Sequence, residues 1–317
     1  MNDQEKYLFD LRGYLVVKNA LTADQIEDLS ARLEVQRKNR ESKRENKKPE
    51  IFGSDRTVIR DESAPAWTAP SLLEWGGTYI DLIDLPNIAP YLETLLGVGY
   101  RLDHDYLKIE NEMSGHTLYL HGGGQGAGGP RDIVGSTDGG QCFYRYNNGK
   151  FYNGLVAVAF ELNDVSPESG GFACVPGSHK MNFPFPEEWR ISKSQATVHE
   201  CVDRVTVNAG DAIIFTEACS HGTVPWDGGA ERRTIFYKYC PHAVTWGACF
   251  YNADNYGDLT ENQRAILTPP SAFGPHEHTA GIWKRAQAEQ AELHRLRKEV
   301  AELRTEQSDR LGTSADS

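Results

Sequence analysis

Hydrophobic and polar residues follow one another with three different spacings along this chain, and each spacing predicts a different kind of element. The apolar run in GYLVVKNA, residues 13–20, predicts a short strand near the N-terminus. Thr22 and Gln25 form a capping-box pair that predicts the start of a helix. The apolar residues of this helix share one face: Ile26, Leu29 and Leu33. A second helical pattern covers residues 80–97 and is interrupted near Pro86.

Between about residues 100 and 240 the pattern becomes that of strands. Short apolar or alternating runs are separated by Gly, Pro, Asp and Asn, and they read YLKIE, TLYLH, LVAVAFEL, FACVPG, RVTVNAG, DAIIF and RTIFYKY. Six or seven strands of this length predict a sandwich or a barrel-like β domain. The helical patterns before them are then expected to pack against this domain.

A heptad pattern distinguishes the C-terminal part of the chain. Apolar residues recur there with spacings of 3, 4 and 3, at Leu293, Leu296, Val300 and Leu303. Ile282 and Ala286 extend this seam, but Glu289 places a charge in it. We therefore predict a main domain over residues 1–280, a helix over 281–310 and a disordered tail over 311–317. The seam either packs against the main domain or forms the contact of a homodimer.

Composition and charge narrow the range of partners. The chain of 317 residues has 33 basic and 45 acidic residues and a net charge of −12, which argues against a binder of nucleic-acid polymers or membrane surfaces. No apolar run approaches the roughly 20 residues of a membrane span. The N-terminus lacks the layout of an export signal, and the six cysteines show no CxxC spacing. We therefore expect a cytoplasmic protein with reduced thiols.

One basic segment contrasts with this acidic chain. Residues 37–48, RKNRESKRENKK, carry seven Lys or Arg and two Glu. This segment is either a solvated helix end or part of a basic lid, over residues 37–60, that attracts an anionic substrate.

Two of the ten histidines stand at the ends of predicted strands, where side chains from separate strands can converge. His121 ends TLYLH, and His221 follows DAIIFTEACS. Imidazole is the commonest metal ligand among protein side chains, so these two residues are candidate ligands. The other histidines lack a partner motif and are expected to be structural or exposed.

The segment after His221 predicts a hairpin. Asp227-Gly228 is a strong two-residue turn signal, and a turn there places Thr223 opposite Arg232. Because side chains alternate along a strand, His221, Thr223, Arg232 and Thr234 would share one face. Arg binds carboxylates through two parallel hydrogen bonds, so this face is a plausible seat for a dicarboxylate cosubstrate.

Three segments resemble the phytanoyl-CoA dioxygenase-like family of Fe(II)/2-oxoglutarate oxygenases: GYLVVKNALTADQ, LNDVSPESGGFACVPGSHK and NAGDAIIF…SHGTVPW…RRTIFYKY. The resemblance extends from about residue 8 to residue 270 and includes the late LTENQRAILTPP. It implies a mainly β fold with flanking helices, built on a double-stranded β-helix of jelly-roll or cupin type. It also implies that the chain is an oxidoreductase.

The resemblance also implies roles for particular residues. His121 and His221 match the two histidine ligands of the metal, and Thr223 and Arg232 match the positions that hold 2-oxoglutarate. Lys108 or Tyr106, on the preceding strand, would complete the cosubstrate pocket. His179, in PGSHK, is a landmark of the family and not a ligand.

The chain departs from the family pattern at one position. The family usually presents His-x-Asp, which completes a triad of two histidines and a carboxylate. Here the residues are His121-Gly122-Gly123, and none of the ten histidines is followed two places later by Asp or Glu. His-x-Gly resembles the 2-oxoglutarate-dependent halogenases, which bind chloride at the position of the missing carboxylate. The implied cofactors are therefore Fe(II), 2-oxoglutarate, O2 and chloride, with Gly123 marking the halide position.

Three functions compete at this point. The first, which the sequence favours, is a halogenase that chlorinates an unactivated C–H bond of a small molecule. The second is a hydroxylase in which water or a more distant acid, such as Asp132 or Asp138, replaces the triad carboxylate. The third is a non-catalytic binding protein, which the predicted cosubstrate seat argues against.

The nature of the substrate rests on weaker signals. Arg60 and Arg131, with the basic segment, either are solvated surface charges or bind a phosphorylated small molecule, for example a nucleotide. A free amino acid or an aromatic natural product is the alternative.

Overall fold

In a computed structural model, the chain forms two compact units, Met1–Ala272 and Phe273–Ser317. The structure describes residues 1–44, 67–70, 72–111, 118–122, 142–183, 185–247, 251–272 and 274–275, and residues 292, 295, 296, 299 and 300 of the second unit. Among the described residues of the second unit, 292, 295, 296, 299 and 300 are helical, and Arg295 forms ion pairs with Glu292 and Glu299. All elements discussed below belong to the first unit.

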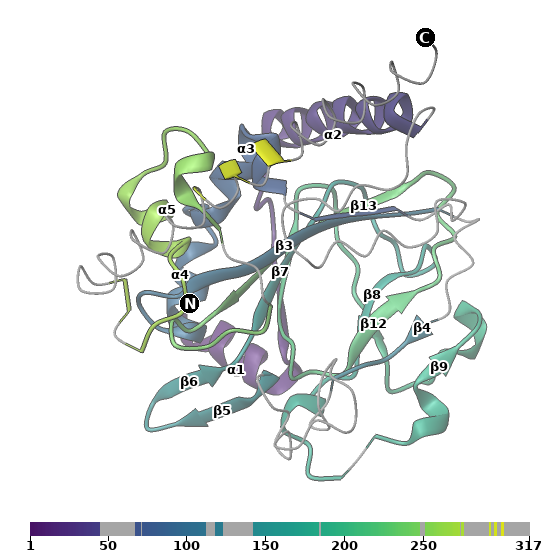
Figure 1. Ribbon diagram of the computed structural model, residues 1–317. Helices are drawn as coiled ribbons and strands as arrows, with labels where there is room; N and C mark the ends of the chain where they lie inside the picture. Colours follow the sequence, from purple (N-terminus) through teal and green to yellow (C-terminus); the bar gives the residue numbers. More distant parts are fainter. Residues whose placement is uncertain are drawn as a thin grey trace. The chain divides into compact units, whose positions relative to one another are not determined.

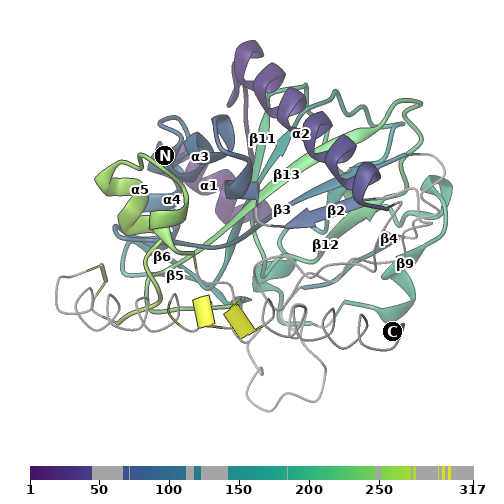
Figure 2. The same cartoon turned by 45° about the horizontal axis from the view of Figure 1, so that its top comes forward.

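The larger sheet of the first unit is antiparallel and has six strands in the order β1-β11-β7-β13-β3-β2. Its strands β3, β7 and β13 are labelled in Figure 1, and β2 and β11 in Figure 2. Its strands are β1 (Tyr14–Val17), β11 (Ala212–Thr216), β7 (Val156–Glu161), β13 (Arg232–Cys240), β3 (Arg101–Glu110) and β2 (Trp67–Pro70). The two central strands of β-branched and aromatic residues, β7 and β13, pair over six residues.

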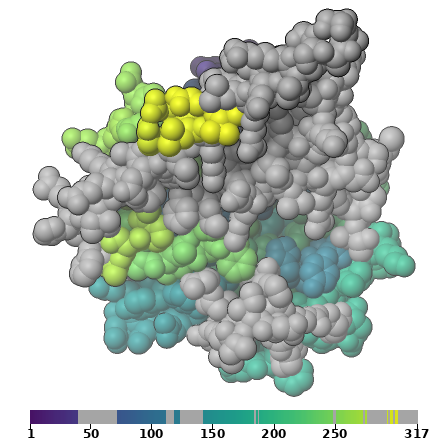
Figure 3. Space-filling model, in the orientation of Figure 1, coloured from purple at the N-terminus to yellow at the C-terminus, as the bar shows by residue number. Residues whose placement is uncertain are grey.

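A smaller sheet has the order β10-β8-β12, and two further strand pairs complete the β structure. Its strands are β10 (Asp203–Arg204), β8 (Gly171–Cys174) and β12 (His221–Val224). The two pairs are β4 (Leu118–Tyr119) with β9 (Ile191–Ser192) and β5 (Tyr144–Asn147) with β6 (Lys150–Asn153). Figure 3 shows the β5–β6 hairpin at the surface, where Tyr146 and Tyr152 are exposed.

Helices cover the outer face of the larger sheet, as Figure 2 shows for α2. The α-helices are α1 (Asp3–Arg12), α2 (Ala23–Arg44), α3 (Thr78–Asp81), α4 (Ala89–Leu96) and α5 (Glu261–Ile266). The 3-10 helices are η1 (Leu72–Trp75), η2 (Leu82–Asp84), η5 (Ser178–Lys180), η6 (Glu187–Trp189), η7 (Gln195–Thr197) and η8 (Ala253–Asn255). No helix among the described residues is long and apolar enough to cross a membrane.

Strand β13 separates two hydrophobic cores because its side chains alternate between the two faces of the sheet. Ile235, Tyr237 and Tyr239 lie in the outer core with residues from the helices, and Tyr237 donates a hydrogen bond of 2.6 Å to the carbonyl of Tyr79. Phe236 lies in the inner core, between the two sheets. The predicted class, a mainly β domain with a jelly-roll core and helices outside it, is confirmed.

Several predicted elements are also confirmed in detail. The strand at GYLVVKNA is β1, and the capping box of Thr22 and Gln25 begins α2 with backbone-to-side-chain hydrogen bonds of 2.9 and 3.2 Å. The helical pattern at 80–97 is interrupted before Pro86, as expected, and resumes in α4. Helix α1 was not anticipated, although Asn2 and Glu5 form a capping box at its start.

The predicted hairpin between β12 and β13 is wrong. Strand β12 pairs with β8 in the smaller sheet, whereas β13 pairs with β3 and β7 in the larger one. The segment that connects β12 to β13 does not form the turn of a hairpin. Its Asp227 amide donates a hydrogen bond of 2.8 Å to the carbonyl of Ser169 instead. Thr223 and Arg232 are therefore not cross-strand neighbours, and they lie on two different sheets.

The outer core generates the first testable prediction. Leu107 lies on β3, is fully buried and belongs to the outer core. Leu107→Ala should lower the free energy of unfolding by about 2–5 kcal/mol, because it removes buried methyl groups and leaves a cavity. Val98→Ala is the control, since Val98 is 92% exposed. Urea unfolding measures both, and equal small effects would contradict the placement of this core.

Candidate metal centre

The two histidines are placed opposite each other by the backbone. Residue His121 follows β4, and an isolated antiparallel bridge joins it to His221 at the start of β12. The two residues exchange amide-to-carbonyl hydrogen bonds of 2.9 and 2.8 Å. Directly opposed residues in an antiparallel pair point to the same face, and the two imidazole centroids lie 4.2 Å apart.

One nitrogen of each imidazole is oriented by a backbone carbonyl. In His221, Nδ1 lies 2.7 Å from the carbonyl oxygen of Cys219, and in His121 it lies 3.4 Å from that of Tyr119. A carbonyl only accepts hydrogen bonds, so each Nδ1 carries a proton and Nε2 is the ring nitrogen left to face a metal. Hydrogen bonding of this kind commonly fixes the tautomer of histidines that bind metals.

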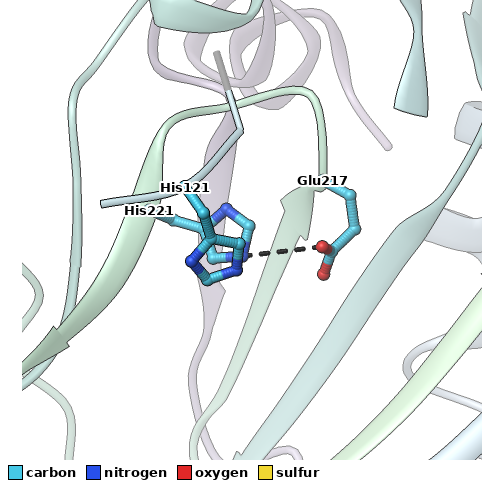
Figure 4. A group of neighbouring side chains, drawn as sticks. All are labelled: His121, Glu217 and His221. Atoms are coloured by element: carbon cyan, nitrogen blue, oxygen red, sulfur yellow. Dashed lines mark ion pairs between the residues drawn. The ribbon is translucent and has the colours of Figure 1, made fainter. Parts of the chain in front are cut away.

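A carboxylate from a third position completes the group. Glu217 follows β11 directly, and Figure 4 shows its side chain pointing toward the two imidazoles. The Glu217 Oε2 atom lies 3.5 Å from His221 Nε2, and the candidate ligand atoms of all three residues lie within 4.8 Å of one another. This is the one such group of His, Cys, Asp and Glu in the part of the chain that the structure describes.

Glu217 is also held by a buried lysine. The Nζ atom of Lys238, on β13, lies 2.7 Å from Glu217 Oε1 and 5.4 Å from the centroid of the Tyr106 ring. One carboxylate oxygen therefore faces the lysine, while the other faces the histidines. Ligating carboxylates are typically hydrogen-bonded in this way by a neighbouring group.

The charges around the centre determine which forms of these groups exist at neutral pH. Burial alone would raise the pKa of Glu217, but the ion pair with Lys238 and the proximity of His221 lower it to about 2. Charge repulsion from His221, together with burial, lowers the pKa of His121 to about 3. Burial alone would lower the pKa of Lys238, but the ion pair with Glu217 raises this pKa above its ordinary range. The centre thus offers an ionised carboxylate and a neutral imidazole.

This donor set fits a transition metal. Two histidines and one carboxylate with open positions are typical of non-haem Fe(II) oxygenases, and His2Glu sites also bind Zn²⁺. His121, Glu217 and His221 are the residues that would hold the ion. The missing His-x-Asp carboxylate is therefore matched by an acid four residues before His221.

Glu217 was missed in the sequence because the acid was sought two residues after each histidine and, beyond that, only at Asp132 and Asp138. A different signal was present. Glu217 ends the apolar run DAIIFTE, and Lys238 interrupts the aromatic run RTIFYKYC. A charge inside a buried strand needs an opposite partner, so these two residues could have been matched with each other.

The predicted cosubstrate residues form a second charged group inside the β structure. Lys108 on β3 donates a hydrogen bond of 3.3 Å to the hydroxyl of Thr223 on β12, so the two sheets meet there. Lys108 Nζ also lies 2.6 Å from Glu110 Oε1. Arg232 is fully buried and forms ion pairs with both Glu110 and Glu161. Thr223 and Arg232 are therefore connected through Lys108, which contacts Thr223, and Glu110, which contacts both Lys108 and Arg232. They are not paired in a hairpin.

Tyr106 lies between the two charged groups. It pairs with Phe236 in the register of β3 and β13, and the two rings stack with centroids 4.7 Å apart. Burial raises the pKa of Tyr106. The Lys238 amine lies over its aromatic ring, so Tyr106 borders the candidate metal centre, and its predicted part in the cosubstrate pocket stays a prediction.

Several predicted positions lie outside the described residues: Gly123, Arg131 and the segment 45–60 of the basic lid, which includes Arg60. The alternative acids Asp132 and Asp138 lie outside them as well. Within the described part of the basic segment, Arg37 on α2 forms an ion pair of 2.8 Å with Glu231. His179 packs edge-on against Tyr144, and its Nε2 lies 3.0 Å from the carbonyl oxygen of Asp10. These contacts are those of a structural histidine.

Comparison with known proteins gives a family match for the central part of the chain. Residues 140–234 match the family model described as Phytanoyl-CoA dioxygenase (PhyH). The matched segment contains Glu217, His221 and Arg232, and it confirms the resemblance found in the sequence. No curated protein matches the sequence.

Solved structures share the fold. HygX from Streptomyces hygroscopicus, with nickel, 2-oxoglutarate and hygromycin B bound, is 24% identical, with a TM-score of 0.60 over 81% of this chain and 95% of that chain. AviO1 from Streptomyces viridochromogenes Tue57 is 20% identical, with a TM-score of 0.50 over 76% and 95%. The non-heme alpha ketoglutarate dependent carbocyclase SnoK from nogalamycin biosynthesis is 15% identical, with a TM-score of 0.51 over 78% and 88%.

The glycine after His121 provides a test of this geometry. Gly122 has a φ of +86°, and a Cβ there would lie 2.5 Å from the carbonyl oxygen of Cys219. Gly149 has a φ of +74° with nothing within 4 Å of its Cβ position. Both Ala variants incur the left-handed cost of about 1–2 kcal/mol. Gly122→Ala should lose about 1–3 kcal/mol more, because the strand that carries His121 must shift.

Urea unfolding measures the stability of the two variants, and Ni²⁺ titration measures the centre itself. We expect weaker Ni²⁺ binding for Gly122→Ala and unchanged binding for Gly149→Ala. Equal stability and equal binding in the two variants would show that the backbone does not approach Cys219 so closely.

Proposed function

We propose, from the phytanoyl-CoA dioxygenase-type region at residues 140–234, that this protein is an Fe(II)/2-oxoglutarate-dependent oxygenase of small molecules. The observation that carries the proposal is the convergence of His121, Glu217 and His221. Bound Fe(II) would supply O2 activation coupled to decarboxylation of 2-oxoglutarate. The chain supplies the ligands, their orientation and a largely buried setting.

The contacts of the three ligands support this assignment. The carbonyls of Tyr119 and Cys219 hold the imidazoles so that both Nε2 atoms can face the metal, and Lys238 keeps Glu217 ionised and in place. HygX, which shares the fold, has been crystallised with iron and with nickel plus 2-oxoglutarate. These likenesses support the proposed cofactors for this chain.

The outcome of the reaction is proposed to be oxygenation, with halogenation as the second candidate. Halogenation is favoured by one observation in the sequence, Gly123 at the place of the usual Asp. Oxygenation is favoured by Glu217, because a carboxylate ligand takes a coordination position that chloride would need. The structure therefore shifts the preference from the halogenase to the oxygenase.

The remaining expectations stay proposals. We propose a small-molecule substrate that is phosphorylated and contacts Arg60 and Arg131. We also propose a cytoplasmic location and a homodimer formed through the C-terminal helix. A thermal-shift screen of nucleoside monophosphates against the corresponding nucleosides would identify a phosphate requirement, because a bound ligand stabilises the folded state.

The role of Glu217 can be tested without substrate. Glu217→Gln should weaken Mn²⁺ binding by at least about 100-fold, since it removes an anionic ligand. Glu34→Gln is the control, because Glu34 forms an ion pair with Arg233 on the outer surface. Calorimetric titration of metal-free protein gives both affinities. Wild-type affinity in Glu217→Gln would exclude this carboxylate as a ligand.

The reaction outcome needs a turnover experiment. In air, with Fe(II), 2-oxoglutarate and chloride, we expect succinate formation, and mass spectrometry of a nucleotide panel should show oxygenated products. These products should form equally in chloride-free buffer. A chlorinated product that disappears without chloride would replace the oxygenase proposal with the halogenase.

Gly123→Asp separates the two candidates further. If Glu217 is the carboxylate ligand, a second carboxylate should lower activity without changing the type of product. If Gly123 marks a halide position, the substitution should abolish chlorination and permit hydroxylation.

A further inference from the structure

Arg232 has no free hydrogen-bonding edge in this structure. Its Nε and Nη2 donate to the two carboxylate oxygens of Glu161, and its Nη1 donates to Glu110 Oε2 at 2.7 Å. Both carboxylates are buried, with at most 1% of their side chains exposed. A ligand carboxylate therefore cannot reach the guanidinium edge unless one of these two glutamates moves away.

The two glutamates are held in different ways. Glu161 binds Arg232 through two parallel hydrogen bonds and also accepts a hydrogen bond of 2.8 Å from the Thr234 hydroxyl. Glu161 lies in β7, which has a paired strand on each side. Glu110 takes a single hydrogen bond from Arg232 and is the last residue of β3. Glu161 is thus the fixed partner of Arg232, and Glu110 is the partner that can be exchanged.

The surroundings of Glu110 have the composition of a carboxylate-binding site. Arg232 Nη1 lies 2.7 Å from one oxygen and Lys108 Nζ lies 2.6 Å from the other. Lys108 also donates to the Thr223 hydroxyl, and 24% of the Lys108 side chain is exposed. A guanidinium, an ammonium and a hydroxyl are the groups that commonly bind a ligand carboxylate.

The charge balance of this group allows a ligand carboxylate to replace one of the two glutamates, but not to be added to them. Two cations, Arg232 and Lys108, face two carboxylates, Glu110 and Glu161. A further buried carboxylate would be uncompensated, which is costly in a medium of low dielectric. Replacement of the Glu110 carboxylate by that of a ligand keeps the balance unchanged.

The position is also suitable relative to the metal centre. Thr223 lies two residues after His221 in β12, so both side chains point to the same face with Cα atoms about 7 Å apart. A small dicarboxylate has a length of this order, so it can extend from His221 toward Thr223 and the Lys108 amine that donates to it.

We propose that Glu110 occupies the seat of a ligand carboxylate between Lys108 and Arg232, and that one carboxylate of the cosubstrate displaces it on binding. This inference rests on the proposed function for the identity of the cosubstrate. Glu110 then acts as an internal competitor, and the affinity for the cosubstrate is reduced by the fraction of molecules in which Glu110 is bound. Glu161 stays in place and orients the guanidinium.

The test uses metal-free full-length protein with acetate and glutarate, which carry the carboxylate but lack the keto acid that chelates a metal. Glu110→Ala removes the competitor and leaves space, so acetate or glutarate should raise its melting temperature with increasing concentration. The apparent affinity should be at least about 10-fold tighter than in the wild type. Glu110→Gln, which removes only the charge, is the second variant if Glu110→Ala does not fold.

Asp211→Asn is the matched control, because Asp211 is a buried carboxylate in an ion pair of 2.8 Å with Lys18, which directly follows the edge strand β1. It should lose stability without any rescue by anions. Equal anion dependence in wild type and Glu110 variants would overturn the proposal.

The test also separates this inference from the proposed function. If the variants bind acetate but Mn²⁺ does not bind at His121, Glu217 and His221, the seat exists and the metal centre fails. If Mn²⁺ binds and the Glu110 variants show no gain in anion binding, the seat fails and the metal centre stands.

Discussion

The buried ion pair of Glu217 and Lys238 is the interaction on which the centre depends. An isolated charge inside a protein is strongly unfavourable, so neither residue could be ionised at this depth without the other. The pair leaves one oxygen of Glu217 toward His221, and the alternation of β13 places Lys238 on the inner face of the larger sheet. The carboxylate is therefore available as an anionic ligand at neutral pH, and it needs no His-x-Asp motif.

The same strand links the two charged groups. Arg232, Thr234 and Lys238 are separated by even numbers of residues on β13, so all three point inward, with Phe236 and its stacked partner Tyr106 between them. One strand thus provides a cation for the metal centre and a cation for the proposed carboxylate seat. The outer face of β13 packs its aromatic rings against the helices, which fixes the strand in position.

The sequence was sufficient to predict elements but not their partners. Local patterns located β1, the start of α2 and the strand-end positions of His121 and His221, because capping and periodicity act over a few residues. The hairpin failed because a turn signal does not determine sheet membership. The Asp227 amide bonds to Ser169, and β12 pairs with β8 across a long sequence separation. Glu217 was missed for a related reason. Its nearness to His121 and His221 comes from the fold, and a fixed spacing in the chain does not predict it.

Charge balance also bears on the choice between oxygenation and halogenation. The six ionised groups named in the interior, Lys108, Glu110, Glu161, Glu217, Arg232 and Lys238, carry equal numbers of positive and negative charges. Lys238, the cation beside the proposed metal centre, is already neutralised by Glu217. A chloride ion there would add a negative charge that none of these six groups compensates. Glu217, as the proposed ligand and as the partner of Lys238, therefore supports the proposed oxygenation over halide binding.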